Sequence, residues 1–135
     1  MAEIRRASRG DREAVLRLWE EAGLGATDDQ QWTSITEGQG TTLLVAEENG
    51  AVVGSAVAAF DGWRAYIYHV AVAPSHQGRG LAKLLMAHSE SHLKALGAPR
   101  TYVLVSESNA AGFALSAAMG FEPEGDVALV KQITA

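Results

Sequence analysis

The spacing of apolar residues in the first forty positions follows the period of a helix more than that of a strand. A short strand is expected at 4–7, before Ser8, which is placed to cap the start of a helix. The apolar positions of that helix recur three or four residues apart: Ala14, Val15, Leu18, Trp19, Ala22. A second, shorter helix is expected to begin after Asp28 and to end near Gly38. The N-terminal part is therefore predicted to be one strand followed by two helices.

The middle of the chain changes to runs of β-branched and apolar residues, which are typical of strands. We expect strands at 42–46, 52–60 and 65–72. Asn49-Gly50 separates the first two runs, and Asp61-Gly62 separates the last two. Such pairs form tight hairpin turns because both residue types tolerate a positive φ. The three strands are therefore predicted to form an antiparallel meander.

The last sixty residues return to a helical period and then alternate again. A glycine-rich turn at 77–80 leads into an expected helix at 81–96. A strand at 101–105 follows, and then a helix that is capped by Asn109 or Ser108 and runs through Ala118. Residues 127–133 alternate weakly, as a last strand would. This alternation of helical and strand periods predicts a mixed α/β domain.

Length and composition favour one folded domain over the whole of 1–135. The chain has 135 residues, of which 47% are hydrophobic and 20% are charged. A domain of this size buries enough surface for a core without disulfides or metals, and its composition does not suggest disorder. With a net charge of −5 and no long basic run, the chain is not expected to have nucleic acid as a main partner.

Two further features bear on compartment and chemistry. The chain has no cysteine, so it can form no disulfide, thiolate zinc site or cysteine nucleophile, which fits a reducing, cytoplasmic location. Its longest apolar stretch, near 51–60, is interrupted by Gly54 and Ser55 and is far shorter than the ~20 residues of a membrane-spanning helix. We therefore expect neither a membrane span nor a membrane partner, and the N-terminus lacks the apolar region of a signal peptide.

The candidate chemistry lies where a strand, a glycine-rich turn and a helix follow one another. The first amides of a helix have no intrahelical acceptor and carry a partial positive charge. Gly78 and Gly80 allow the backbone to approach a ligand, and Arg79 adds a cation. This arrangement predicts a phosphate site. It is neither a P-loop nor the dinucleotide fingerprint, in which a third glycine would replace Lys83.

The turn resembles the Gln/Arg-x-x-Gly-x-Gly/Ala motif of the GNAT superfamily of N-acetyltransferases, here Gln77-x-x-Gly80-x-Ala82. Nearly the whole chain shares the resemblance, since 70–74, Asn109 and Gly120-Phe121 also match the family's pattern. The expected order of elements matches that of the small, stand-alone bacterial members. The resemblance implies a mixed, mainly antiparallel sheet flanked by about four helices.

The resemblance also implies that acetyl-CoA is the acetyl donor and that no metal is needed. One amide of the third meander strand, taken as that of Val70, would stabilise the oxyanion of the tetrahedral intermediate. Asn109 would contact the donor near its pantetheine arm, and the arm itself would pair with the strand backbone. The positions that would bind the donor are Val70, Ala71, Val72, Gln77, Gly78, Arg79, Gly80, Leu81, Ala82 and Asn109.

The chain departs from the family's pattern at the positions of the acid and the base. Ser116 stands where many members have a tyrosine that protonates the thiolate, and Tyr66 stands where some keep a glutamate base. Tyr66 and Tyr68 are therefore candidate acids, and period two places both on one strand face together with Val70. Glu107 could act as a base through water. His69 is expected on the opposite face.

Two histidines, His88 and His92, lie one helical turn apart, a spacing that can hold a metal. They do not form the His-Glu-x-x-His pattern, because Glu90 lies midway between them, and no third ligand is evident. No metal site is therefore expected.

The function predicted from these residues is transfer of an acetyl group from acetyl-CoA to a primary amine by direct attack. The amine could belong to a small molecule or a peptide, and nearby acidic residues favour a cationic one: Glu21, Asp28, Asp29, Asp61. The alternative is a CoA-binding sensor or interaction domain with little catalysis, which Ser116 and the missing carboxylate motivate. A homodimer is also expected from the family resemblance.

Overall fold

The computed structural model describes residues 2–134. Five strands form one sheet in the order β1-β2-β3-β4-β5, in which the first four strands pair antiparallel and β5 pairs parallel to β4. The strands are β1 (Glu3–Arg6), β2 (Thr41–Glu48), β3 (Ala51–Phe60), β4 (Ala65–Val72) and β5 (Tyr102–Val103). The predicted antiparallel meander of three strands is thus confirmed, and it forms the centre of the sheet.

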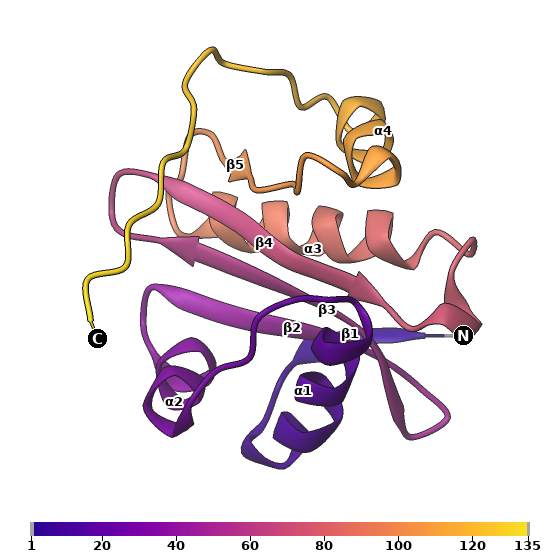
Figure 1. Cartoon of the computed structure of the whole chain (residues 1–135). Helices are drawn as coiled ribbons and strands as arrows, with labels where there is room; N and C mark the ends of the chain where they lie inside the picture. Colours follow the sequence, from indigo (N-terminus) through magenta and orange to yellow (C-terminus); the bar gives the residue numbers. More distant parts are fainter. Residues whose placement is uncertain (1, 135) are drawn as a thin grey trace.

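Helices cover both faces of this sheet (Figure 1). Helices α1 and α2 lie on one face, α3 lies on the other, and α4 follows β5. Their bounds are α1 (Arg12–Glu21), α2 (Asp29–Glu37), α3 (Leu81–Ala95) and α4 (Ala110–Ala118), with short 3-10 helices η1 (Arg9–Asp11) and η2 (Pro74–His76). The mixed α/β architecture with four helices agrees with the expectation from the sequence.

Each face of the sheet has its own hydrophobic core. On the α1–α2 face, Trp19 and Trp32 pack with inward-facing strand residues such as Val45. On the α3 face, Leu85 and Leu93 belong to two further clusters, which include Ala56 and Ile67 respectively. The alternation of side chains along β2 and β3 supplies both cores, because successive residues point to opposite faces of a sheet.

The two predicted hairpin turns form by different means. Asn49 and Gly50 both have a positive φ, of 52° and 80°. In the second turn the Asp61 carboxylate accepts hydrogen bonds from the amides of Trp63 and Arg64, each at 2.8 Å. Both bonds lower the pKa of the Asp61 carboxyl, and the bond from Arg64 has the larger effect.

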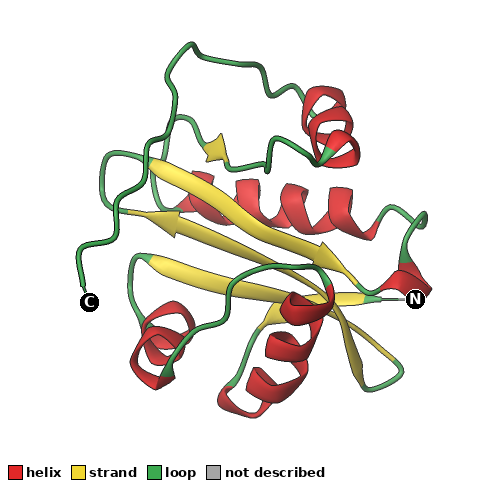
Figure 2. Ribbon diagram, viewed as in Figure 1, coloured by secondary structure: helices red, strands yellow, loops and turns green. Residues whose placement is uncertain are grey.

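The expected strand at 101–105 is shorter than predicted, and the expected strand at 127–133 is absent. Only Tyr102 and Val103 pair with β4. Residues 121–134 form no helix or strand and run as an extended loop past the β3–β4 hairpin (Figure 2). A strand requires a partner ladder, and this segment has an alternating pattern without one. Its apolar side chains are 79–100% exposed: Val127, Leu129, Val130, Ile133. Within residues 2–134, no helix is long and apolar enough to cross a membrane.

A β-bulge interrupts β4 and corrects the predicted faces of its residues. Ser55 pairs with Ala71 while Val57 pairs with Tyr68, so the two residues His69 and Val70 oppose one residue of β3. Tyr68 packs against the α1–α2 core, but Val70 packs against the two clusters on the α3 face. The prediction that Val70 shares a face with Tyr66 and Tyr68 was wrong, because an extra residue shifts the alternation by one.

Candidate active site

The glycine-rich turn has the geometry of an anion site. Gly78 and Gly80 both have φ of 79°, and a Cβ added at either would meet no atom within 4 Å. Glycine is therefore required at these positions by backbone conformation and not by lack of space. Gly80 is also the N-cap of α3 and offers no side-chain cap.

The first turn of α3 presents free backbone amides next to this glycine. Leu84 donates to the Gly80 carbonyl at 3.0 Å, in the bond that starts the helical ladder. The amides of Leu81, Ala82 and Lys83 lie before that bond, and in a helix such groups have no intrahelical acceptor. A diphosphate can accept hydrogen bonds from amides in this position and is favoured there by the helix dipole.

Side chains attach the turn to the sheet at two points. The Gln77 side-chain amide donates to the Val72 carbonyl at 3.1 Å, which ties the turn to the end of β4. The Glu48 carboxylate, near the end of β2, lies 2.8 Å from Nε2 of His76 and 3.4 Å from the Arg79 guanidinium. Arg79 is thus oriented beside the turn by a carboxylate 31 residues earlier in the chain, a contact that sequence reasoning missed.

Next to the turn, β4 has an open edge. Its parallel pairing with β5 covers only Tyr66 and Ile67, and one further bond joins the Leu104 amide to the Ile67 carbonyl at 3.1 Å. Beyond this point the two strands diverge, so residues 68–72 of β4 have no strand partner on the β5 side among the described residues. An unpaired strand edge can bind an extended ligand through main-chain hydrogen bonds.

The two candidate tyrosines lie at different places along β4. Tyr66 stacks on Tyr102 of β5, with ring centroids 5.3 Å apart and planes inclined by 25°. Tyr68 is the first residue of the open edge and is half-buried, and this burial raises the pKa of its phenol above the ordinary value of 10.0. Of the two, Tyr68 is therefore better placed to act on a ligand bound along that edge.

The remaining predicted site residues come from the segment after β5. Asn109 caps α4, where its side-chain oxygen accepts from the Gly112 amide at 2.9 Å and its NH₂ group is not used in that bond. Glu107 is exposed in the loop between β5 and α4. Ser116 is the buried residue of α4, with 7% of its surface exposed. These three residues thus lie beyond the point where β4 and β5 diverge.

A buried hydrogen-bond chain at the bulge was not predicted from the sequence. The Trp19 indole donates to the Ser55 hydroxyl at 2.8 Å, and that hydroxyl donates to the His69 carbonyl at 2.9 Å. His69 Nε2 lies 3.0 Å from the carbonyl oxygen of Gly25, in the α1–α2 loop. The participants are far apart in sequence, and their residue types alone give no signal of their contact.

The two histidines of α3 contact different groups and do not face a common site. His88 Nδ1 lies 3.1 Å from the Leu84 carbonyl oxygen, and His92 Nε2 lies 2.8 Å from the Thr42 hydroxyl. Burial, and secondly the charge of Arg6, lower the pKa of His92. In the part of the chain that the structure covers, no group of three or more His, Cys, Asp or Glu residues is placed to hold a metal.

Comparison with known proteins agrees with this geometry. The family model described as "Acetyltransferase (GNAT) family" matches residues 3–121. An acetyltransferase of Yersinia pestis (strain Pestoides F) is 32% identical over an alignment of 134 residues that covers 97% of this chain and 95% of that protein. An acetyltransferase of Pectobacterium atrosepticum is 33% identical over the same length and the same shares.

Solved structures share the fold at lower sequence identity. An aminoglycoside N-acetyltransferase in complex with CoA superposes with a TM-score of 0.84 at 21% identity, over 99% of this chain and 96% of that one. An aminoglycoside acetyltransferase from a soil metagenomic sample, in complex with sisomicin, has a TM-score of 0.81 at 17% identity, over 99% and 97%. The extent of the family match and of the relatives' similarity shows that this chain belongs to the acetyltransferase (GNAT) family and is an acetyl-CoA-dependent N-acetyltransferase.

Proposed function

We propose that this chain acetylates a primary amine by direct attack of the amine on acetyl-CoA bound along β4. The observation that carries the proposal is the continuity of two binding features. The open edge of β4 at 68–72 leads directly into the anion site at 77–82, and Gln77 ties the two together. One extended ligand with a diphosphate at one end can therefore bind to both.

Each part of the donor has a proposed set of contacts. The backbone of Val70, Ala71 and Val72 pairs with the pantetheine arm as an added strand would. The backbone amides of the turn and first helical turn hold the diphosphate: Gln77, Gly78, Arg79, Gly80, Leu81, Ala82. The NH₂ group of Asn109 reaches the arm from the α4 side.

In the proposed reaction the amine nitrogen forms a bond to the thioester carbon, and the carbon–sulfur bond then breaks. The amide of Val70 stabilises the oxyanion, and such a donor is worth about 3 kcal/mol of barrier. The nitrogen loses a proton, and the sulfur leaves as a thiolate that gains one. We assign this second proton to Tyr68, because Tyr66 is stacked on Tyr102, at the paired end of β4. Ser116 is the lesser candidate for this proton, and Glu107, through water, is a candidate base for the proton that the nitrogen loses.

The acceptor is proposed to be a cationic amine, by analogy with the neighbour whose structure contains sisomicin. Three of the four acidic residues on which the expectation of a cationic amine was based make structural contacts within the chain. Asp28 caps α2, Asp29 pairs with Arg12, and Asp61 holds the β3–β4 turn. Both small-molecule and peptide amines therefore belong among the acceptors to be tested.

An amine panel tests the proposed function. We expect thiol release from acetyl-CoA to depend on an added amine, and mass spectrometry to find the acetylated product. The panel should contain aminoglycosides, small primary amines and peptides with free N-termini, with calorimetry of acetyl-CoA binding run in parallel. Tight acetyl-CoA binding without turnover on any amine would instead support the CoA-binding sensor or interaction domain.

We further propose a homodimer in which a second copy covers the exposed apolar side chains of residues 127–133. Their alternation suits a strand, and β5 is an edge strand of the sheet. Light scattering should give the mass of a dimer for the native chain and of a monomer for the double variant Leu129→Ser, Val130→Ser. A native mass of one chain would contradict the proposal. A cytoplasmic location belongs to the same set of proposals and is supported by the lack of cysteine.

A further inference from the structure

The bulge residue His69 is held in an unusual backbone conformation. Its φ of 50° lies in the left-handed region, which only one other described non-glycine residue, Asn49 of a hairpin turn, also occupies. Such a conformation costs about 1–3 kcal/mol and persists only where the surroundings enforce it. Here the hydrogen bond from Ser55 enforces it: Ser55, which is fully buried, donates to the His69 carbonyl and accepts from the Trp19 indole.

The side chain of His69 is held as firmly as its backbone. Its ring meets the Trp19 ring edge to face, with centroids 4.8 Å apart, and meets the Tyr68 ring in the same manner at 5.6 Å. Nε2 faces the Gly25 carbonyl oxygen at 3.0 Å. A carbonyl oxygen can only accept, so in the neutral imidazole Nε2 carries the hydrogen and Nδ1 keeps the lone pair. His69 therefore presents a proton acceptor at a defined position.

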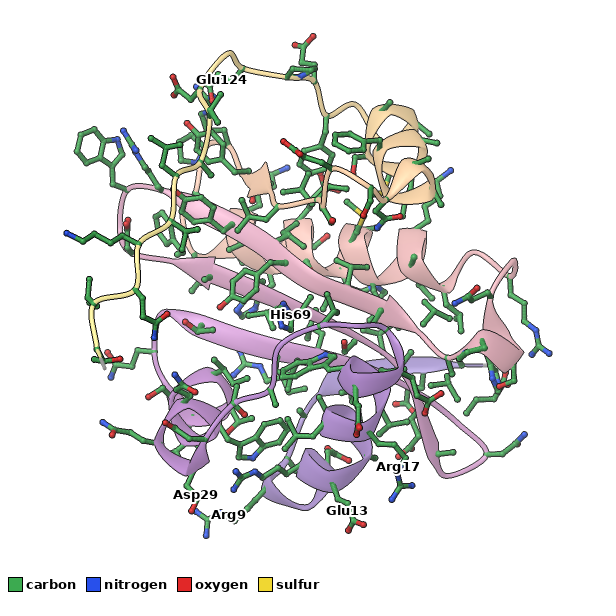
Figure 3. All side chains as sticks on the ribbon, viewed as in Figure 1. Arg9, Glu13, Arg17, Asp29, His69 and Glu124 are labelled. Atoms are coloured by element: carbon green, nitrogen blue, oxygen red, sulfur yellow. The ribbon has the colours of Figure 1, made fainter. Side chains whose placement is uncertain are left out.

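The prediction that His69 lies on the face opposite Tyr68 was wrong, because the bulge places its ring on the α1–α2 face of the sheet. His69 contacts Trp19 and Tyr68 on the α1–α2 side, and Figure 3 shows it between β4 and the α1–α2 loop. His69 and the next residue, Val70, both lie within the unpaired edge at 68–72 that is proposed to bind acetyl-CoA. A proton acceptor thus lies one residue from the amide assigned to the oxyanion.

Few charges face the ring from the surrounding elements. Tyr68 is the titratable group in direct contact with it. On α1, Glu13 and Arg17 pair with each other and point away from His69 (Figure 3), and Glu20 is exposed. In and after the α1–α2 loop, Asp28 caps α2 and Asp29 pairs with Arg12. No carboxylate among these is bonded to the imidazole, which leaves Nδ1 to take a proton from a ligand.

We propose that His69 is the general base that accepts the proton of the acceptor amine through Nδ1. This inference rests on the proposed function. The amine attacks in its neutral form, after a cationic acceptor has lost one proton to solvent. As the nitrogen–carbon bond forms, the amine nitrogen gives a second proton to Nδ1, and the carbon–sulfur bond breaks with its electrons moving to sulfur. The thiolate gains its own proton from Tyr68 or water, the imidazolium of His69 returns its proton to solvent, and a deprotonated Tyr68 regains one from solvent. The base is thus assigned to His69 at the bulge, in place of Glu107 acting through water.

The test compares His69→Gln and His69→Gly with the native chain, using the best amine of the panel. Glutamine can keep the donor to the Gly25 carbonyl but cannot take up a proton at neutral pH, so it separates a structural role from a chemical one. Glycine adopts φ of 50° without strain and leaves room for added imidazole. His88→Gln, on the exposed face of α3, is the matched control.

We expect His69→Gln to lower kcat/KM at pH 7 about 100-fold, with acetyl-CoA affinity unchanged. Added imidazole should restore a measurable part of the activity of His69→Gly. His88→Gln should match the native chain.

Different outcomes overturn different claims. Turnover by the native chain, with the kcat/KM of His69→Gln within about twofold of the native value, would overturn the role of His69 alone. Lack of rescue of a folded, CoA-binding His69→Gly by imidazole would count in the same direction. Lack of native turnover on every amine, despite acetyl-CoA binding, would overturn the proposed function and this inference with it.

Discussion

Gly80→Val is expected to raise the dissociation constant for acetyl-CoA about 100-fold, which corresponds to about 2.7 kcal/mol of binding free energy. Gly80 has φ of 79°, a region that a β-branched residue strongly avoids. To relax, the backbone must rotate, and the first amides of α3 then turn away from the diphosphate. Each charge-assisted hydrogen bond lost costs about 1.5–3 kcal/mol. Calorimetric titration with acetyl-CoA gives the measurement.

Gly97→Val is the matched control for this strain. Gly97 follows α3 at its other end, has φ of 98°, and a Cβ there would also meet no atom within 4 Å. Both variants should lose stability by about 1–2 kcal/mol in thermal unfolding, since both force a side chain into the left-handed region. Only Gly80→Val should lose affinity. Equal affinity losses in the two variants would show that the effect is general strain and that the turn does not bind the diphosphate.

Tyr68→Phe is expected to lower kcat about 100-fold while leaving the KM for acetyl-CoA within about twofold of the native value. A general acid contributes about 10²–10⁴ to a rate, and removal of the phenol leaves only water to protonate the thiolate. Burial raises the pKa of Tyr68, so the phenol stays protonated past its ordinary value of 10.0. The native kcat should therefore fall only above that pH, and this fall should vanish in Tyr68→Phe. Steady-state rates measured from pH 7 to 11 are the check.

Tyr66→Phe separates the two tyrosines. Its ring can keep the stack on Tyr102, and at the paired end of β4 its hydroxyl is not expected to reach the thioester. We expect activity within about threefold of the native chain. If instead Tyr66→Phe is crippled and Tyr68→Phe is not, the acid has been assigned to the wrong residue of β4. If neither changes, solvent or Ser116 protonates the thiolate, and a gain of activity in Ser116→Tyr would then support a missing acid.

Some features of the fold were predictable because local chemistry alone enforces them. The Asn49-Gly50 turn, the capped starts of α2 and α4, and the left-handed Gly80 each depend on residues within four positions of one another. Their agreement with the sequence analysis follows from that short range. The meander is of the same kind, since tight turns between apolar runs leave only antiparallel pairing open.

The segment at 127–133 shows the limit of such patterns. Its alternation is that of a strand, but alternation describes only which faces could be apolar and does not supply a partner. β5 ends after two residues, and the following chain bends away toward α4, so no ladder forms with 127–133 in the described structure. Pairing across a sheet is a property of the whole chain.

The sequence by itself determined the order of the elements as far as α4, the glycine-rich turn before α3 and the family to which they point, because each depends on residues that are close together in the chain. Only the tertiary structure decided which face His69 and Val70 occupy and which edge of β4 stays open. Those depend on the contact of Trp19 and Ser55, 36 residues apart, and on the divergence of β5. One extra residue in a strand moves every later side chain to the opposite face of the sheet. A bulge is defined by the pairing with the neighbouring strand, so a two-residue period in the sequence does not reveal it.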